Sequence, residues 1–433
     1  MRNRMVKLGM TAILAALLAG AALAGTTPLQ AGSEDGVLVF ESQDSQFKWW
    51  FDVRGYIDVA TYFDDGPLYH VEDDFDDPDD WADYEDEFSD FFDRQNSLPG
   101  GALIRRARMA LKAQLWGDWY SEVDMDFAEE AAALKDAYIS YRGLFDGNGR
   151  IRVGNFRQPF GLEEVTTSRN LMFMERSQGT DPFSVGRRMG LEVTGWRENY
   201  RWSVSAFGGD VENYVKYANE QVSYAARLNF TPIRTEDSVL MIGAAGTMQK
   251  PTFIDEDLKF NTRPETNVSD TKFLYAKYKD VDSYNVFGGE LVYVNKRLMA
   301  QGEYMAAKVK FLDDDPDAST GGGYVFLSYF LTDDTHVYDH RDAEIGRVVP
   351  AAASGAWEVA ARYSTVDLND EENGEMGGKS NAITLGVNYY PNANIKCMLN
   401  YGIVDNDINA DGRGDYRGDY DFQYLSMRFQ TAF

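Results

Sequence analysis

The feature that most constrains this chain is a short alternation of apolar and polar residues that recurs over much of its length. From Arg106 to Leu115 the odd positions are apolar and the even positions are mostly polar, and the runs 357–364, 383–389 and 395–401 follow the same rule. The last ten residues, YLSMRFQTAF, alternate in the same way. A period of two is typical of β-strands with one apolar face. Charged residues are too frequent on the second face for a packed core, so we expect that face to meet water.

The N-terminal residues carry the pattern of an export signal. Three basic residues, Arg2, Arg4 and Lys7, precede the apolar run LGMTAILAALLAGAA, and Ala22-Leu23-Ala24 offers a small-residue cleavage site. The apolar run is shorter than a spanning helix normally needs, and the sequence after it offers no second candidate helix. We therefore expect a cleaved signal over residues 1–24, a short N-terminal periplasmic segment over 25–46 and the main domain over 47–433.

Strand pattern and export signal together predict an all-β fold, a transmembrane antiparallel β-barrel of about sixteen strands in the outer membrane. Apolar side chains would face lipid, polar side chains would face a wet lumen, and closure would leave no unpaired backbone edge in hydrocarbon. Short links such as GD, RENY, NKR and PNAN alternate with longer ones, as periplasmic turns alternate with extracellular loops. The final strand, which ends in Phe433, resembles the signal that the barrel-assembly machinery reads.

Composition argues against several other classes of protein. The formal net charge of −28 disfavours nucleic acid or an anionic lipid surface as a general partner. The single cysteine, Cys397, rules out an intramolecular disulfide framework. A loop metal site at His336 and His340 is a minority interpretation, because a third ligand at defined spacing is missing. The sequence contains no nucleophile elbow, phosphate-cradling loop or zinc-protease helix, so we expect neither an enzyme nor a cofactor.

Four ordered blocks of the sequence resemble the phosphate-selective porin O and P family. They read RVGNFRQPFGLEEVTTSRNLMFMERS from Arg152, FLTDDTHVYDHRDAEIGRVVP from Phe330, GAWEVAARYSTVDLND from Gly355 and NAITLGVNYYPNANIKCMLNYG from Asn381. The similarity runs over nearly the whole chain after the signal. It implies a sixteen-stranded homotrimeric outer-membrane channel, usually anion-selective, whose pore is narrowed by two infolded extracellular loops and one long periplasmic turn.

Three links of this sequence match those constricting elements. The first infolded loop is expected over Arg157–Gly186, the fifth outer loop over Thr247–Val281 and the long periplasmic link over Thr332–Ala356. Planar guanidinium groups with several donors suit phosphate-like oxyanions, and successive weak sites let an ion enter and leave. The candidate pore and anion-binding residues are Arg157, Arg169, Arg176, Arg187, Arg188, Arg341 and Arg347, with Arg106, Arg108 and Lys112 on the strands.

Two observations keep other interpretations open. Arg106, Arg108 and Lys112 face the acidic positions of the next run, Glu122, Asp124 and Asp126, so bracing the barrel is their default role. The stretch 64–93, expected to be the first extracellular loop, holds fifteen carboxylates and no Lys or Arg. We expect a passive channel for small hydrophilic solutes, with phosphate or polyphosphate-like anions first. The alternatives are a general or cation-preferring porin, an occluded structural or surface-binding barrel, and an outer-membrane hydrolase.

The alternation also predicts details of facing and register. The outward set is expected to comprise Met109, Leu111, Val123, Met125, Val359, Ala361, Leu385 and Leu399. A two-residue turn after Trp116 would pair even positions with odd ones and break the facing rule. We therefore predict a three-residue turn, Gly117-Asp118-Trp119, which pairs Lys112 with Asp124 and Gln114 with Glu122.

Overall fold

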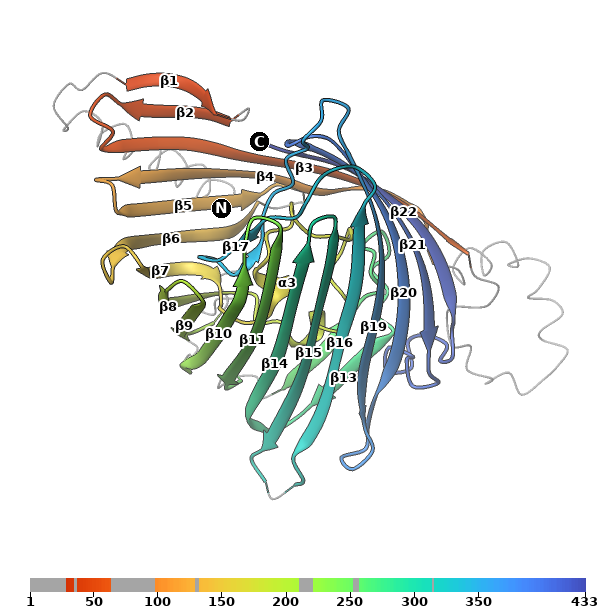
Figure 1. Ribbon diagram of the computed structural model, residues 1–433. Helices are drawn as coiled ribbons and strands as arrows, with labels where there is room; N and C mark the ends of the chain where they lie inside the picture. Colours follow the sequence, from red (N-terminus) through yellow and green to blue (C-terminus); the bar gives the residue numbers. More distant parts are fainter. Residues whose placement is uncertain are drawn as a thin grey trace, which may run out of the picture.

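The alternating runs of the sequence form the strands of a closed antiparallel barrel in the computed structural model (Figure 1). The structure describes residues 29–34, 37–63, 98–128, 132–209, 221–251, 257–313 and 315–433. Sixteen strands of this part of the chain make up the barrel, which confirms the fold expected from the sequence. They are β3 (Phe47–Phe63), β4 (Gly101–Leu115), β5 (Trp119–Asp126), β6 (Ala133–Leu144), β7 (Gly149–Arg157), β8 (Arg187–Trp196), β9 (Tyr200–Phe207), β10 (Ser223–Arg234), β11 (Ser238–Gln249), β14 (Val281–Asn295), β15 (Leu298–Phe311), β16 (Ala318–Phe330), β19 (Ala356–Asp370), β20 (Glu375–Asn392), β21 (Ile395–Asn406) and β22 (Phe422–Ala432).

The barrel closes where its last strand pairs with its first. Residues 423–432 of β22 lie antiparallel to residues 54–63 of β3. The amide of Phe433 donates to the carbonyl of Val53 at 3.0 Å, and the amide of Val53 donates back to the carbonyl of Phe433 at 2.6 Å. Closure satisfies the backbone groups of both edge strands, as a hydrocarbon environment requires.

A separate hairpin extends the sheet at the start of β3, on the edge that pairs with β22 from residue 54 onward. It consists of β1 (Leu29–Glu34) and β2 (Val37–Ser42), and β2 pairs with residues 48–50 of β3. Figure 1 shows both strands lying beside the start of β3. Among the described residues, no helix is both long and apolar enough to cross a membrane.

Side chains alternate between the two faces of the barrel strands as predicted. Leu385 has 49% of its surface exposed, whereas Thr384 beside it is fully buried on the lumen side. Met109, Val359, Ala361 and Leu399 are also exposed, and Leu111, Val123 and Met125 are partly exposed. All eight residues of the predicted outward set therefore lie on the outer face.

The predicted register of the hairpin β4–β5 is wrong by two residues. Lys112 lies opposite Glu122 and Gln114 opposite Tyr120, because Leu115 pairs with Trp119. The three-residue turn is Trp116-Gly117-Asp118 instead of Gly117-Asp118-Trp119. Trp116 adopts a left-handed conformation with φ of 49° and does not continue the strand, while the ring of Trp119 packs 5.2 Å from that of Tyr141. Even-numbered residues of β4 still pair with even-numbered residues of β5, so each side chain remains on the face that was predicted.

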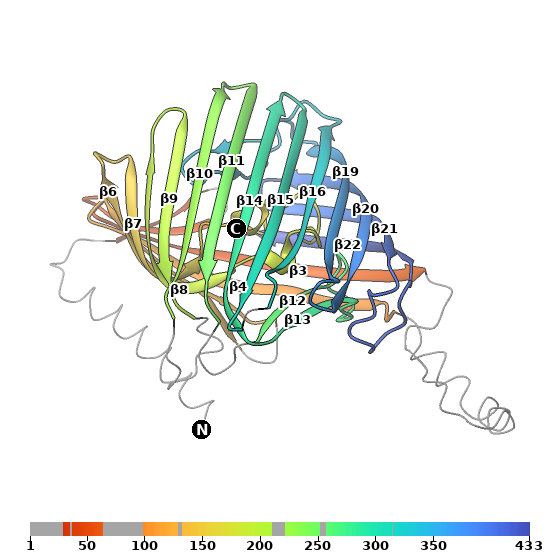
Figure 2. The same cartoon turned by 90° about the horizontal axis from the view of Figure 1, so that it is seen from below.

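Three long links fold into the barrel and narrow it. The link 158–186 contains α3 (Leu162–Val165) and the short 3₁₀ helix Asp181–Phe183, and the link 250–280 contains β12 (Leu258–Thr262) and β13 (Leu274–Tyr278). The link 331–355 contains β17 (Tyr338–Asp339) and β18 (Glu344–Ile345). Figure 1 shows α3 and β17 enclosed by the barrel strands, and Figure 2 shows β9, β10, β11 and β14–β16 side by side in the wall.

Apolar and polar contacts hold these links against the strands. Phe273 of the link 250–280 packs 5.6 Å from Phe422 of β22. The ammonium group of Lys396 of β21 donates a hydrogen bond to the carbonyl of Leu171 at 2.7 Å. The amide of Asn170 donates to the carbonyl of Ile345 at 2.9 Å, which joins the link 158–186 to the link 331–355.

Candidate pore constriction

The infolded links and one side of the barrel enclose a polar cavity of about 280 Å³, which we call the central cavity. Its walls come from strands between β3 and β10 and from the links 158–186 and 331–355. The basic residues that line it are Arg54, Lys112, Arg142, Arg150, Arg152, Arg157, Arg169, Arg187, Arg201 and Arg227. The acidic residues that line it are Glu122, Asp136, Glu192, Asp342 and Glu344. The lining is therefore basic, although the whole chain is strongly acidic.

Most basic residues of the central cavity reach it because they occupy the lumen phase of a strand. Arg150 and Arg152 of β7 alternate with the apolar residues Ile151 and Val153, so both side chains point inward. Arg201 of β9 and Arg227 of β10 follow the same rule, and both are buried. The barrel thus places guanidinium groups from neighbouring strands side by side.

Carboxylates hold many of these cations in place. Asp52 accepts from Arg54 at 2.8 Å, from Lys112 at 2.9 Å and from Arg169 at 2.6 Å. Glu192 accepts from Arg152 at 2.9 Å. Because Asp52 alone serves three cations, the cluster around it keeps an excess of positive charge.

Two lining arginines form no ion pair with a carboxylate within the described ranges. Arg142 is exposed, and its guanidinium carbon lies 3.7 Å from the ring centroid of Tyr120. Arg201 is buried; it donates to the carbonyl of Arg341 at 2.9 Å and to the hydroxyl of Ser203 at 3.2 Å. Both groups keep donors that are not taken up by an anionic side chain.

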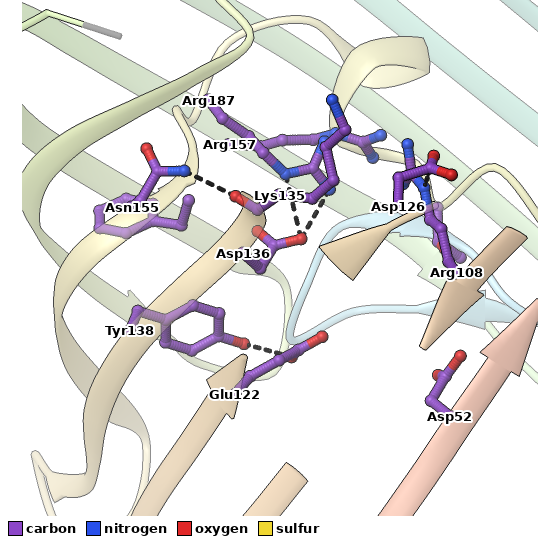
Figure 3. A network of polar contacts seen from close by, with 12 residues as sticks. Asp52, Arg108, Glu122, Asp126, Lys135, Asp136, Tyr138, Asn155, Arg157 and Arg187 are labelled. Carbon is purple, nitrogen blue, oxygen red and sulfur yellow. Dashed lines mark hydrogen bonds and ion pairs between the residues drawn. The ribbon is translucent and has the colours of Figure 1, made fainter. Parts of the chain in front are cut away.

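The structure brings four of the ten sequence-predicted site residues to the central cavity: Lys112, Arg157, Arg169 and Arg187. Arg157 lies 3.2 Å from Glu164, and Arg187 lies 2.6 Å from Asp136, as Figure 3 shows for the second pair. Burial alone would raise the pKa of Glu164, but Arg176 and Arg157 lower it below its usual value. Glu164 therefore stays ionised and offsets part of the charge of its arginines.

Arg176 lines a second cavity, of about 270 Å³, between the links 158–186 and 250–280. Its guanidinium lies 3.0 Å from Glu164 and donates to the carbonyl of Glu163 at 2.9 Å. Arg105, Arg263 and Lys272 line the same cavity with the acids Glu175 and Asp181. This second cavity also carries more basic than acidic side chains.

The remaining predicted residues lie outside the central cavity. Arg106 is buried with its guanidinium 5.9 Å from the ring of Tyr56, and Arg108 pairs with Asp126 at 2.7 Å (Figure 3). Arg188 donates to the carbonyl of Arg187 at 2.8 Å. Arg341 is exposed.

The periplasmic link brings acids, not its arginines, to the central cavity. Arg347 donates to the carbonyl of Ala393 at 2.6 Å and lines a small separate pocket beside Arg169. Two acids of the same link reach the central cavity instead. Asp342 pairs with Arg150 at 2.5 Å, and Glu344 accepts a hydrogen bond from the amide of Thr167 at 3.1 Å. Burial, with Asp342 nearby, raises the pKa of Glu344 to about 8, so this acid is mostly neutral at pH 7.

Sequence reasoning missed six lining cations: Arg54, Arg142, Arg150, Arg152, Arg201 and Arg227. The signal was available, because each lies on the polar phase of an alternating run. Arg105 carried no such signal, since a β-bulge between β3 and β4 turns it inward beside Arg106. There it pairs with Glu175 at 2.7 Å.

Comparison with known proteins gives both sequence and structural matches. A match to the family described as phosphate-selective porin O and P covers residues 80–433. Porin O of Pseudomonas aeruginosa is 26% identical over 377 residues, which are 78% of this chain and 84% of that protein. An uncharacterized protein of Caulobacter vibrioides is 28% identical over 323 residues, which are 70% of this chain and 63% of that protein. The chain thus matches less than two thirds of the Caulobacter protein's length.

Two solved porin structures share the barrel. The anion-selective porin from Comamonas acidovorans has 13% identity and a TM-score of 0.53, with 89% of this chain and 100% of that chain covered. The trimer form of OmpT, an outer membrane protein of Vibrio cholerae, has 9% identity and a TM-score of 0.52, with 89% and 99% covered. At such identities the likeness establishes the fold.

Proposed function

Because this chain belongs to the phosphate-selective porin O and P family, whose members are outer-membrane channels, we propose that it is a passive channel that favours phosphate-like anions. The observation that carries the proposal is the charge of the central cavity, where basic side chains outnumber acidic ones by ten to five. A passive channel of this kind needs no catalytic residue, and the proposal assigns none.

The basic lining supports anion preference because selectivity is decided where the pore is narrow. Exposed charges more than about 8–10 Å away are largely screened at physiological salt, whereas charges on the narrow walls are not. Asp52 and Glu192 hold several of the wall arginines in position. Arg142 and Arg201, which lack a carboxylate partner within the described residues, supply donors for a passing oxyanion.

The decisive experiment measures reversal potential across a planar bilayer under a KCl gradient, followed by titration of the current with phosphate. In the variant Arg142→Gln/Arg201→Gln, we expect the reversal potential to move toward cations. We also expect phosphate block to weaken at least about fivefold, since one unit charge at about 4 Å is worth about 1 kcal/mol even in water. The double variant Arg234→Gln/Arg297→Gln removes the same charge from positions at turns outside the central cavity and should leave both quantities unchanged.

The alternatives give opposite outcomes in the same measurements. A general or cation-preferring porin, which the net charge of −28 favours, would show a reversal potential near zero or of cation sign in the unaltered protein. An occluded structural or surface-binding barrel would show no single-channel conductance. Either result would overturn the anion-channel proposal.

The proposal extends to assembly and export. We infer a homotrimer, supported by the shared barrel and by the trimer form of the Vibrio cholerae protein. We also infer removal of residues 1–24, a periplasmic place for 25–46, and recognition of the strand ending in Phe433 by the barrel-assembly machinery. Cross-linking of the purified protein and N-terminal sequencing of the mature chain test the first two inferences.

A further inference from the structure

Three carboxylates meet on the lumen side of β5 and β6, beside the central cavity. One oxygen atom from each of Glu122, Asp124 and Asp136 lies within 4.8 Å of the others. Glu122 and Asp136 line the central cavity, and Asp124 lies behind them, 1% exposed. We call these three residues the acidic triad; Figure 3 shows Glu122 and Asp136 projecting from their strands.

Asp124 is the unusual member of the acidic triad. Neither of its carboxylate oxygens has a hydrogen-bond partner among the described residues. A buried carboxylate without a partner is costly, so native structures nearly always supply one. Arg54 and Arg108 pair with other carboxylates: Arg54 with Asp52 at 2.8 Å and Arg108 with Asp126 at 2.7 Å.

The two outer members of the acidic triad are held in position by neighbours. Tyr120 and Tyr138 donate to Oε2 of Glu122 at 3.0 and 2.9 Å, and Lys112 lies 3.5 Å from Oε1. Arg187 donates to Oδ2 of Asp136 at 2.6 Å. Each outer member is oriented through some of its atoms, which leaves lone pairs of the remaining oxygens to face Asp124.

The acidic triad lies at a β-bulge. The register between β5 and β6 shifts between Val123 and Met125, so two residues of β6, Lys135 and Asp136, oppose Asp124. The amide of Asn155 donates to the carbonyl of Lys135 at 2.6 Å and fixes the bulge, as Figure 3 shows. Such bulges commonly re-aim side chains at functional sites. On the other side Asp124 faces the small residue Ala110 of β4, which leaves room.

We propose that the acidic triad binds a divalent cation, with Ca²⁺ as the best match. Three carboxylates form the hard, all-oxygen ligand set that Ca²⁺ prefers, and lumen water completes its six to eight ligands. Two oxygens on opposite sides of a Ca²⁺ ion, each about 2.4 Å away, are about 4.8 Å apart, so three oxygens that lie within 4.8 Å of one another can share one ion. The bound ion supplies the partner that Asp124 lacks.

The surrounding cations limit the affinity. Lys112 and Arg187 contact the outer members of the acidic triad and repel a further positive charge. We therefore expect a dissociation constant of about 0.1–1 mM, the range of weak extracellular calcium modules. This site does not depend on the anion preference of the channel, because its test measures binding and not current.

Binding is tested with Tb³⁺, whose luminescence is sensitised by nearby tyrosine and tryptophan. Tyr120 and Tyr138 touch Glu122, so purified full-length protein should show Tb³⁺ emission that Ca²⁺ displaces. In the variant Asp124→Asn, the Tb³⁺ emission that comes from the acidic triad should disappear, because the affinity of the site should fall at least tenfold. Asp126→Asn, which removes the neighbouring carboxylate of the same strand, should retain it.

A crystallographic measurement keeps the proposal testable if Asp124→Asn does not fold. Crystals of the unaltered protein soaked in Tb³⁺ should give an anomalous peak among the three carboxylates. No peak there, or Tb³⁺ binding that is the same in Asp124→Asn and in the unaltered protein, would overturn the site. In that case the remaining Tb³⁺ emission comes from carboxylates elsewhere.

Discussion

At the residue scale, the face on which a strand residue lies decides the solvent that its side chain meets. Leu385 of β20 points to lipid, and its neighbours Thr384 and Gly386 belong to the lumen phase. A charged side chain on the outer face has no partner in hydrocarbon. The amount by which it lowers the free energy of unfolding depends on its depth in the bilayer. The position along the strand therefore matters as much as the face.

This depth dependence gives the first prediction. Leu385→Arg, in the middle of β20, should lower the free energy of unfolding from lipid by about 2–4 kcal/mol, because the guanidinium would lie near the bilayer midplane. Ile395→Arg, at the start of β21 beside a turn, should cost about 0–1 kcal/mol. Reversible urea titration in lipid vesicles measures both. Equal costs at the two positions would contradict the assignment of a lipid-facing midplane.

The raised pKa of Glu344 gives a pH-dependent prediction. This acid lines the central cavity on the link 331–355, near Asp342, Asp339 and Arg157. Below a pH of about 8 it is mostly neutral and leaves the basic excess intact; above that pH it becomes a carboxylate and reduces the excess. The ratio of anion to cation permeability should therefore fall as pH rises from 7 to 9. Glu344→Gln should flatten this change, and an unaltered pH profile in that variant would contradict the role of Glu344.

The residue scale also shows how much of the cavity the sequence could predict. Arg150, Arg152, Arg201 and Arg227 lie on lumen phases that the alternation identifies, so their inward direction was predictable. Their gathering at one cavity depends on the shear of the barrel and on where the links fold, which no local pattern contains. Arg105 was less predictable, because it sits in a bulge that interrupts the period of two.

At the element scale, buried charges tie the infolded links to the barrel. Arg362 of β19 is 1% exposed and contacts two links at once. It lies 3.3 Å from Glu163 of the link 158–186 and donates to Glu265 of the link 250–280 at 3.2 Å. Its guanidinium also donates to the carbonyl of Glu175 at 3.1 Å. One side chain thus sets the position of both extracellular links.

Removing that tie gives the third prediction. Arg362→Leu should lower the free energy of unfolding by about 3–5 kcal/mol, because it leaves Glu163 and Glu265 buried without their cation. The freed links should also make the single-channel current larger and noisier. Arg297→Leu breaks an exposed pair with Asp333 and should cost about 0–1 kcal/mol with an unchanged current. Equal effects of the two substitutions would show that Arg362 does not hold the links.

Elements were predictable from the sequence to different degrees. The strands and the three long links follow from alternation and length. The register of the hairpin β4–β5 was not predictable. A shift of the pairing by two residues leaves every side chain on the same face, so the alternation cannot detect it. The left-handed backbone at Trp116 decided it instead. Ion pairs between links, such as those of Arg362, join residues too far apart in sequence for local patterns.

At the scale of the whole molecule, the sign of the total charge and the sign of the constriction are opposite. The chain carries −28, yet the central cavity is lined by twice as many basic as acidic residues. Fifteen of the carboxylates lie between Asp64 and Asp93, outside the described residues. Net charge acts at long range on the approach of ions, whereas the lining acts at short range on their passage.

This separation gives the last prediction, which uses ionic strength to distinguish the effect of the net charge from the effect of the cavity lining. Deletion of 72–90 removes twelve carboxylates and no Lys or Arg, so anions should reach the pore faster. The Debye length is about 30 Å at 0.01 M salt and about 3 Å at 1 M, so the gain in anion conductance should be large at low salt and vanish at high salt. The reversal potential at 1 M salt should not change, because the central cavity keeps its lining.

A matched variant separates charge from chain length in this experiment. Replacing the twelve acids of 72–90 by Asn and Gln keeps the length and should reproduce the low-salt gain. If the deletion raises conductance equally at 0.01 M and 1 M salt while the neutralised variant does not, the segment obstructs the pore sterically. If either variant shifts the reversal potential at 1 M salt, these carboxylates act at the constriction itself, and the division between approach and passage is wrong.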